Sequence, residues 1–175
     1  GAGRFTLERI LADDVPVFTG DTGRLDHRQA PATLALAEPP GEPGHALRVT
    51  LHTPLRLKQA NVLQRDLPFH GLIRAALRRI SALETAYGQG EPPLDYRGLV
   101  HDAERVETEV STLCWQDLKR YSNRQQQKVS LSGLAGTVVY RGDLNEFVPL
   151  LEYASRVNLG KQTGFGLGQM TMARQ

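Results

Sequence analysis

The chain has 175 residues, of which 40% are hydrophobic and 23% charged, and its formal net charge is +2. These values predict one or two small domains with a core and exclude a disordered or uniformly basic chain. A single cysteine, Cys114, excludes an internal disulfide and fits a reducing cytoplasm, and no apolar run reaches the roughly 20 residues that span a bilayer. We therefore expect a soluble, cytoplasmic protein without a membrane partner.

The first 44 residues contain short extended runs followed by a polar linker. Phe5 and Leu7 alternate with polar residues over residues 4–11, and residues 15–18 are a second extended candidate. The chain lacks an initial Met and enters a strand-like run almost at once. We therefore expect residues 1–44 to be the end of a preceding domain and a linker, with an exposed hinge at the Pro- and Gly-rich residues 39–44.

Two helices are predicted after this hinge. The apolar residues between positions 68 and 87 form one continuous helical stripe, and Pro68 suits the first turn of that helix. Asp143 and Glu146 resemble a capping box before the apolar residues 144–151. Pro149 fits this second helix only near its start.

Four strands complete the pattern. We expect them at residues 46–57, 105–115, 129–140 and 167–172. Pro54 predicts an edge or a bend in the first strand, and the polar residues 122–128 are typical of a hairpin tip. The order predicts an α+β, ferredoxin-like (βαββαβ) fold over residues 45–175, an antiparallel sheet with two helices on one face, plus an N-terminal extension.

The strongest functional signal is a glycine-rich segment between the last helix and the last strand. Its glycines alternate, so in an extended chain one face would carry no side chains and a phosphodiester backbone could approach it. Lysine, glutamine and threonine in the same segment are groups that contact phosphate and sugar. A glycine-rich turn that packs against the preceding helix is the alternative. The candidate contact residues are Gly160, Lys161, Gln162, Thr163, Gly164, Gly166 and Gly168.

Two groups of basic residues are further candidate phosphate contacts. One lies in an acid-free stretch at the expected hairpin tip and comprises Lys119, Arg120, Arg124 and Lys128. The other lies on the polar face of the first helix, where a spacing of four stacks His70, Arg74 and Arg78. A solubilising loop and an ordinary polar helix face are the respective alternatives.

The histidines indicate neither a metal site nor a clear catalytic centre. His27, His45, His52, His70 and His101 show no spacing that fixes a metal, so we expect no metal and no cofactor. A histidine side chain can act in acid/base catalysis near neutral pH. His70 is the catalytic candidate, because its helix also presents Arg74 and Arg78. Trp115 and Tyr121 could stack on bases, or pack in the sheet.

The glycine-rich segment GKQTGFGLG, residues 160–168, resembles the C-terminal glycine-rich loop of the RAMP superfamily, in particular the CRISPR repeat-processing endoribonucleases. Other segments resemble that family in the same order, namely residues 53–58, 69–83, 115–125 and 131–136. The resemblance covers residues 45–173 approximately, and the order of its segments is more specific than any one motif.

This resemblance implies binding and processing of CRISPR repeat RNA by metal-independent acid/base cleavage. The complete enzymes of that family have two tandem ferredoxin-like domains, and the catalytic histidine usually lies in the N-terminal one. The chain would then be the RNA-binding C-terminal portion. The alternative is a non-catalytic RAMP subunit that coats guide RNA in a CRISPR effector complex. Besides RNA, the partners left open are other subunits of such a complex and a second copy of the chain in a homodimer.

Two other ferredoxin-like classes fit the sequence less well. An RNA-recognition motif needs aromatic residues on its central strands, and residues 130–140 offer only Tyr140. An acylphosphatase would need a compact anion-binding loop early in the domain, where the sequence shows none.

Overall fold

The computed structural model describes residues 4–12, 14–26, 33–41, 44–122 and 126–175. The chain forms two compact units, Gly1–Leu34 and Ala35–Gln175. Each unit has its own antiparallel sheet.

The smaller unit is a three-stranded sheet. β1 (Arg9–Ala12) pairs with β2 (Val15–Thr19), which pairs with β3 (Arg24–Leu25). The predicted first strand therefore begins at Arg9 and not at residue 4. No described residue of this unit is buried, and the side chain of Phe5 is 94% exposed. The smaller unit thus has no core among its described residues.

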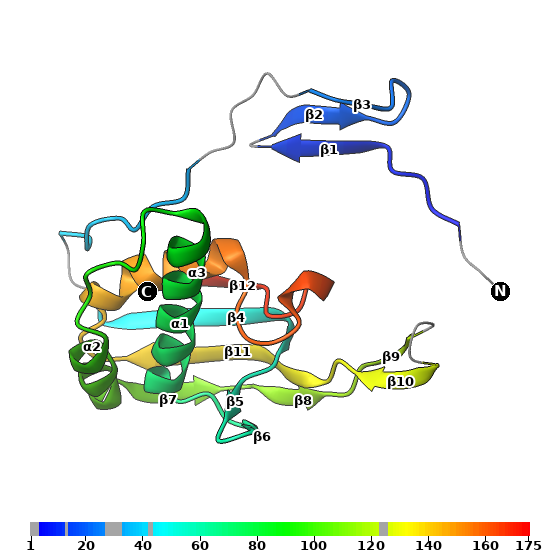
Figure 1. Cartoon of the computed structure of the whole chain (residues 1–175). Coiled ribbons are helices and arrows are strands. Elements are labelled where there is room, and N and C mark those ends of the chain that lie inside the picture. Colours follow the sequence, from blue (N-terminus) through cyan, green and yellow to red (C-terminus); the bar gives the residue numbers. More distant parts are fainter. Residues whose placement is uncertain (1–3, 13, 27–32, 42–43, 123–125) are drawn as a thin grey trace. The chain divides into compact units, whose positions relative to one another are not determined.

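The larger unit is built on a five-stranded antiparallel sheet (Figure 1). In chain order its strands are β4 (Ala46–Leu55), β7 (Glu107–Ser111), β8 (Cys114–Gln116), β11 (Gly133–Arg141) and β12 (Met170–Arg174). Across the sheet the order is β12-β4-β11-β7, and β8 also pairs with β11. β4 and β11 are thus central, and β12 and β7 flank them. This order confirms the predicted ferredoxin-like fold class.

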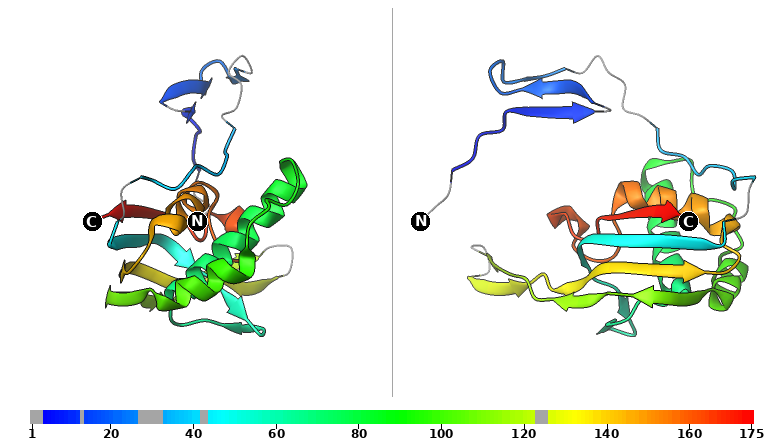
Figure 2. Two further views of the ribbon diagram at one scale, coloured as in Figure 1. Left: turned by 90° about the vertical axis from the view of Figure 1, so that its left-hand side faces the viewer. Right: turned by 180° about the vertical axis from the view of Figure 1, so that it is seen from behind.

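Two helices cover one face of this sheet, as predicted (Figures 1 and 2). α1 (Phe69–Tyr87) follows β4, and α3 (Val148–Val157) follows β11. Pro68 is the N-cap residue of α1, where its missing N–H costs no helical hydrogen bond. The predicted apolar stripe of α1 is buried from Phe69 to Ile80 and packs over the sheet.

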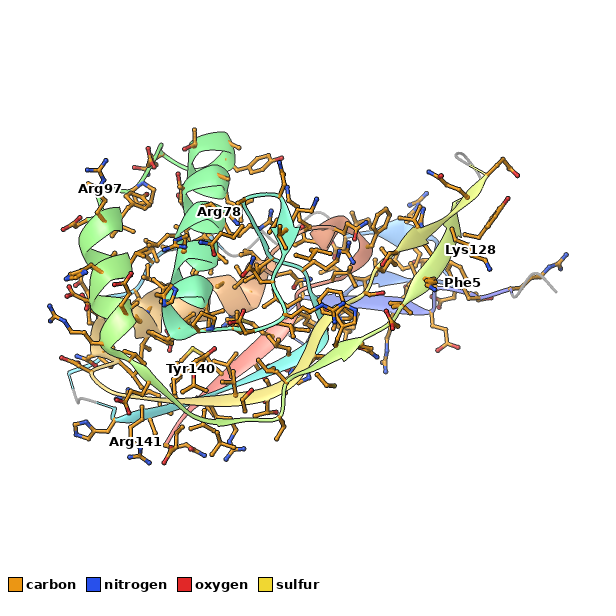
Figure 3. The ribbon with its side chains drawn as sticks, turned by 90° about the horizontal axis from the view of Figure 1, so that it is seen from below. Phe5, Arg78, Arg97, Lys128, Tyr140 and Arg141 are labelled. Atoms are coloured by element: carbon orange, nitrogen blue, oxygen red, sulfur yellow. The ribbon has the colours of Figure 1, made fainter. Side chains whose placement is uncertain are left out.

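The core lies between the sheet and these helices, and Phe69, Tyr140 and Phe147 are buried together in it. The ring of Phe69 meets the rings of Tyr140 and Phe147 edge-on, with centroids 4.9 and 5.1 Å away. The Tyr140 hydroxyl donates a 2.7 Å hydrogen bond to the carbonyl of Leu67. Figure 3 shows Tyr140 pointing from β11 toward the helices and its neighbour Arg141 pointing to the opposite face.

A third helix, α2 (Tyr96–Asp102), is absent from the sequence-based prediction. None of its residues is buried, so it has no apolar stripe for periodicity to detect. The Asp95 carboxylate caps it by accepting a 2.9 Å hydrogen bond from the backbone N–H of Gly98. This capping residue is the signal that could have revealed the helix. A 3₁₀ turn, η1 (Ala103–Arg105), then leads into β7.

Two predicted strands are each divided in two. The prediction at residues 105–115 corresponds to β7 and β8, and that at 129–140 to β10 (Gln127–Ser130) and β11. Ser132 explains the second break, because its hydroxyl bonds to both backbone groups of Leu118, at 3.0 and 3.2 Å. Beyond this break β10 pairs with β9 (Lys119–Ser122) in a separate two-stranded hairpin.

The start of α3 differs from the expected capping box. A 3₁₀ turn, η2 (Asn145–Phe147), precedes the helix, and Phe147 occupies the N-cap without a side-chain hydrogen bond. Pro149 lies in the first helical turn, the place where a proline is compatible with the helix. The capping-box prediction is therefore wrong, while the helix itself is confirmed.

Candidate functional site

The glycine-rich segment forms a loop, residues 158–168, that folds back onto the end of β4. The backbone N–H of Lys161 donates to the carbonyl of Arg56 at 2.9 Å, and that of Gly168 donates to Pro54 at 3.2 Å. The Thr53 hydroxyl donates to the carbonyl of Gly166 at 2.8 Å. It also accepts from the N–H of Gln169 at 2.9 Å. We call residues 158–168 the glycine loop, and its anchor is the 53–56 segment.

The glycine loop is not extended, and the predicted glycine face is therefore wrong. A 3₁₀ turn, η3 (Thr163–Phe165), occupies its centre. Gly160, Gly166 and Gly168 have φ values of 84°, 78° and 75°, in the left-handed region that favours glycine. The alternation of glycines along the sequence consequently produces turns and not a flat surface.

The glycines of the loop divide into two kinds by their surroundings. A Cβ atom on Gly168 would lie 1.8 Å from the carbonyl oxygen of Leu159, and one on Gly160 would lie 2.5 Å from that of Arg56. A Cβ on Gly164 or Gly166 would have no atom within 4 Å. The alternative of a packed glycine-rich turn thus accounts for Gly160 and Gly168. Gly164 and Gly166 instead leave open space at the surface.

The polar side chains of the loop differ in exposure. Lys161 is exposed, whereas Gln162 and Thr163 are half-buried. The side-chain oxygen of Gln162 is buried and has no hydrogen-bond partner in the part of the chain that the structure describes. Lys161 is therefore the side chain of the three that can most readily meet a ligand's phosphate.

The β9–β10 hairpin contacts the glycine loop at Arg120. The guanidinium carbon of Arg120 lies 4.3 Å from the centroid of the Phe165 ring. This cation–π geometry joins a candidate cation of the hairpin to the loop that carries Lys161. Arg120 and Phe165, far apart in sequence, thus meet. We define the loop–hairpin surface by these two residues and by Lys161 of the same loop, all three of them exposed.

Lys119 and Lys128 lie on the face of the hairpin opposite Arg120. Arg120 is paired with Val129, whereas Lys119 pairs with Ser130 and Tyr121 with Lys128. Successive side chains of a strand alternate between faces, so Lys119 and Lys128 share a face that excludes Arg120. The predicted cluster is therefore divided. Its fourth member, Arg124, lies outside the described residues.

The three stacked residues of α1 do lie together. His70, Arg74 and Arg78 line one pocket of about 200 Å³. Lys58 and Gln59 of β5 (Lys58–Gln59), which forms a small hairpin with β6 (Val62–Leu63), line the same pocket. Figure 3 shows Arg78 on α1 well apart from Lys128 on the hairpin. The α1 pocket is thus a second basic region.

Arg56 and Phe165 are site residues whose roles the sequence did not predict. The Arg56 guanidinium donates a hydrogen bond to the carbonyl of Ser132, while its own carbonyl holds Lys161. Arg56 therefore connects β4, the start of β11 and the glycine loop. Arg56 lies in the 53–56 segment, far from the glycine loop in sequence. The sequence alone therefore signals this role only weakly, because the contact forms only in the folded chain.

The two candidate stacking residues have different environments. Trp115 is half-buried, and the guanidinium carbon of Arg65 lies 4.6 Å from its ring centroid. Tyr121 is 54% exposed, and its hydroxyl donates a 3.0 Å hydrogen bond to the side-chain oxygen of Gln126.

In the described ranges, no three or more His, Cys, Asp or Glu side chains are grouped so as to hold a metal ion. No helix there is long and apolar enough to cross a membrane.

Comparisons with known proteins agree on one family. The family model described as CRISPR-associated endoribonuclease Cas6 matches residues 49–170, more than half of the chain. A Cas6 product complex is 21% identical, with a TM-score of 0.53, over 76% of this chain and 53% of that chain. Thermus thermophilus Cas6 is 13% identical, with a TM-score of 0.56, over 75% and 55%. A partial Cas6-RT-Cas1–Cas2 complex is 15% identical, with a TM-score of 0.60, over 93% and 29%.

These structural similarities show a shared fold. The chain spans about half the length of the first two Cas6 structures, 53% and 55%. No curated protein sequence matches it significantly.

Proposed function

The chain belongs to the CRISPR-associated endoribonuclease Cas6 family, and from this premise we propose that it binds CRISPR repeat RNA as the RNA-binding C-terminal portion of a repeat-processing endoribonuclease. The observation that carries the proposal is the contact between Arg120 and Phe165, which joins the hairpin to the glycine loop. An RNA strand that follows the loop–hairpin surface would meet the cations of Arg120 and Lys161. A cytoplasmic location is part of the proposal.

Phosphate contact is the chemistry that the loop–hairpin surface supports best. Lys161 and Arg120 are both exposed, and Gly164 and Gly166 present backbone without side chains at the same loop. Arginine and lysine supply charge to phosphate, and neutralising phosphates makes affinity fall with salt. The α1 pocket, with Arg74 and Arg78, would contact a different part of the RNA.

Cleavage is assigned in this proposal to a histidine of the N-terminal domain that the family resemblance implies, outside residues 1–175. His70 is the candidate within the chain, because it lines the α1 pocket with Arg74 and Arg78. A missing acid or base partner typically lowers the rate by about 10²- to 10⁴-fold. We therefore expect this chain to bind repeat RNA without cutting it efficiently.

The test is a titration of labelled repeat RNA at several salt concentrations. We expect the double substitution Lys161→Ala and Arg120→Ala to weaken binding uniformly across RNA sequences. Removing one cation from a phosphate should reduce the slope of log K against log salt by about 0.7 to 0.9. The matched control replaces Arg97 and Arg105, exposed arginines of α2 and η1, and removes the same charge. Figure 3 shows Arg97 at the end of the unit opposite Lys128.

The same RNA, incubated with the chain in EDTA, reports cleavage. Equal salt slopes for the two double variants, with both proteins folded, would refute phosphate contact at the loop–hairpin surface. Rapid cutting at one site that His70→Ala abolishes would place catalysis in this chain. Binding without cutting by a longer protein that includes both halves would favour the guide-RNA-coating subunit.

A further inference from the structure

The glycine loop buries its aliphatic side chains but presents an aromatic ring. Leu159 and Leu167 are 0% and 3% exposed, whereas Phe165 between them is 54% exposed. Burying a phenylalanine side chain stabilises a fold, and an exposed ring forgoes that stabilisation. An exposed ring between two buried leucines therefore indicates a surface available for contact.

The backbone on both sides of Phe165 leaves the ring accessible. Gly164 and Gly166 carry no side chains, and no atom lies within 4 Å of the Cβ positions they lack. Two backbone hydrogen bonds of 2.9 Å, Phe165 to Gln162 and Gly166 to Thr163, fix the turn that holds the ring. A planar ligand could thus reach the ring without displacing a neighbouring side chain of the turn.

The cation beside the ring decides the class of ligand. Arg120 lies over Phe165 at 4.3 Å, so a flat apolar surface and a positive charge are presented together. Single-stranded nucleic acid is bound by this combination, with bases stacking on aromatic rings or guanidinium planes while cations meet the backbone. A duplex offers no free base face along its length, so the surface suits an unpaired nucleotide.

We propose that Phe165 and Arg120 form a stacking platform for one unpaired RNA base at the glycine loop. This proposal rests on the proposed function, because it names the part of the RNA that the loop–hairpin surface takes. The base stacks on Phe165 or on the Arg120 guanidinium that covers it, and the platform tolerates any base because every base has a flat π face. Repeat RNA is then held at an unpaired position and not along a duplex.

The experiment compares Phe165→Leu, which keeps apolar bulk without a π face, with Phe165→Tyr, which keeps the ring. The probes are a short single-stranded RNA with 2-aminopurine at successive positions and the same RNA annealed to its complement. We expect Leu to weaken single-strand binding by about 5- to 150-fold, and Tyr to leave it unchanged. Stacking should quench the fluorescence of 2-aminopurine at one position of the RNA. Of the two variants, only Phe165→Leu should lose this quenching.

The outcomes separate this proposal from the one on which it rests. If the unmodified chain binds neither RNA, the proposed function fails. If it binds RNA with a salt slope that depends on Lys161, but Phe165→Leu changes neither affinity nor quenching, the stacking platform is refuted and the function stands. Equal weakening of single-strand and duplex binding in a folded Phe165→Leu protein would likewise refute the platform, because the ring would then only support the loop.

Discussion

Glu146 illustrates how the surroundings of one residue make stability depend on pH. Partial desolvation at the start of α3, with the nearby carboxylates of Asp102 and Asp143, raises the pKa of Glu146 above its usual value. The fold therefore favours the protonated carboxyl more than the unfolded chain does. The stability that this group contributes is fully present below the unfolded pKa and is lost as pH rises through the higher folded pKa.

We expect Glu146→Gln to stabilise the protein at pH 7 and to have little effect at pH 4. The amide removes the charge that the desolvated site and two neighbouring carboxylates disfavour. The gain should be small, at or below the roughly 0.5 kcal/mol typical of surface substitutions. Urea denaturation at both pH values measures it, with Glu107→Gln on exposed β7 as the control. An equal gain at both pH values would contradict this electrostatic explanation.

At the scale of an element, the glycine loop is a turn held by β4. Its backbone bonds to Thr53, Pro54 and Arg56, so its shape depends on tertiary contacts. Gly168 combines a φ of 75° with a carbonyl oxygen at its missing Cβ, Gly166 has only the positive φ, and Gly164 has neither constraint. The three positions therefore separate steric crowding from backbone strain.

Alanine substitutions should follow that ranking in the free energy of unfolding. Gly164→Ala should be nearly neutral, and Gly166→Ala should cost about 1 to 2 kcal/mol for a left-handed residue with a Cβ. Gly168→Ala should cost more, because the Cβ would overlap the carbonyl of Leu159. Chemical denaturation of the three variants measures the series. A Gly168→Ala protein as stable as Gly164→Ala would show that the loop is not packed as described.

The sequence located the glycine loop but could not predict its shape. Spacing places glycines at alternate positions, yet whether they lie in an extended chain or in turns depends on the carbonyl groups of Arg56 and Leu159. The hairpin is a contrasting case. Proximity in sequence groups its cations together. The alternation of side chains along β9 instead separates Arg120 from Lys119. The contact between Arg120 and Phe165 joins residues 45 positions apart, and local patterns carry no signal for it.

At the scale of the whole molecule, periodicity predicted the elements that build the core. The apolar stripe of α1 and the alternating apolar residues of β4 are buried. The order of helices and strands along the chain was sufficient to predict the ferredoxin-like fold. Periodicity could not reveal α2, which buries none of its residues. Periodicity also could not predict the break at Leu131–Ser132, because the bonds of Ser132 to Leu118 form only in the folded chain.

The distribution of buried residues predicts which part of the chain is needed for folding. Every buried residue in the described ranges lies between Ala46 and Met170, within the larger unit. The smaller unit keeps large apolar side chains such as Phe5, Leu11 and Leu25 exposed. Since burial of apolar surface is the dominant favourable contribution to folding, the larger unit should carry the cooperative unfolding transition.

We therefore expect a chain of residues 35–175 to unfold cooperatively, with a Tm within about 2 °C of that of the full chain. At this size, such a shift corresponds to a change of less than about 1 kcal/mol in the free energy of unfolding. It should also bind repeat RNA with unchanged affinity, because Arg120, Lys161 and Phe165 all lie in the larger unit. The matched control removes residues 170–175 instead. It should lose the transition, because β12 pairs with β4 and Met170 is 1% exposed. Calorimetry and the RNA titration measure both chains, and a large fall in Tm on removing residues 1–34 would show that the core depends on the smaller unit.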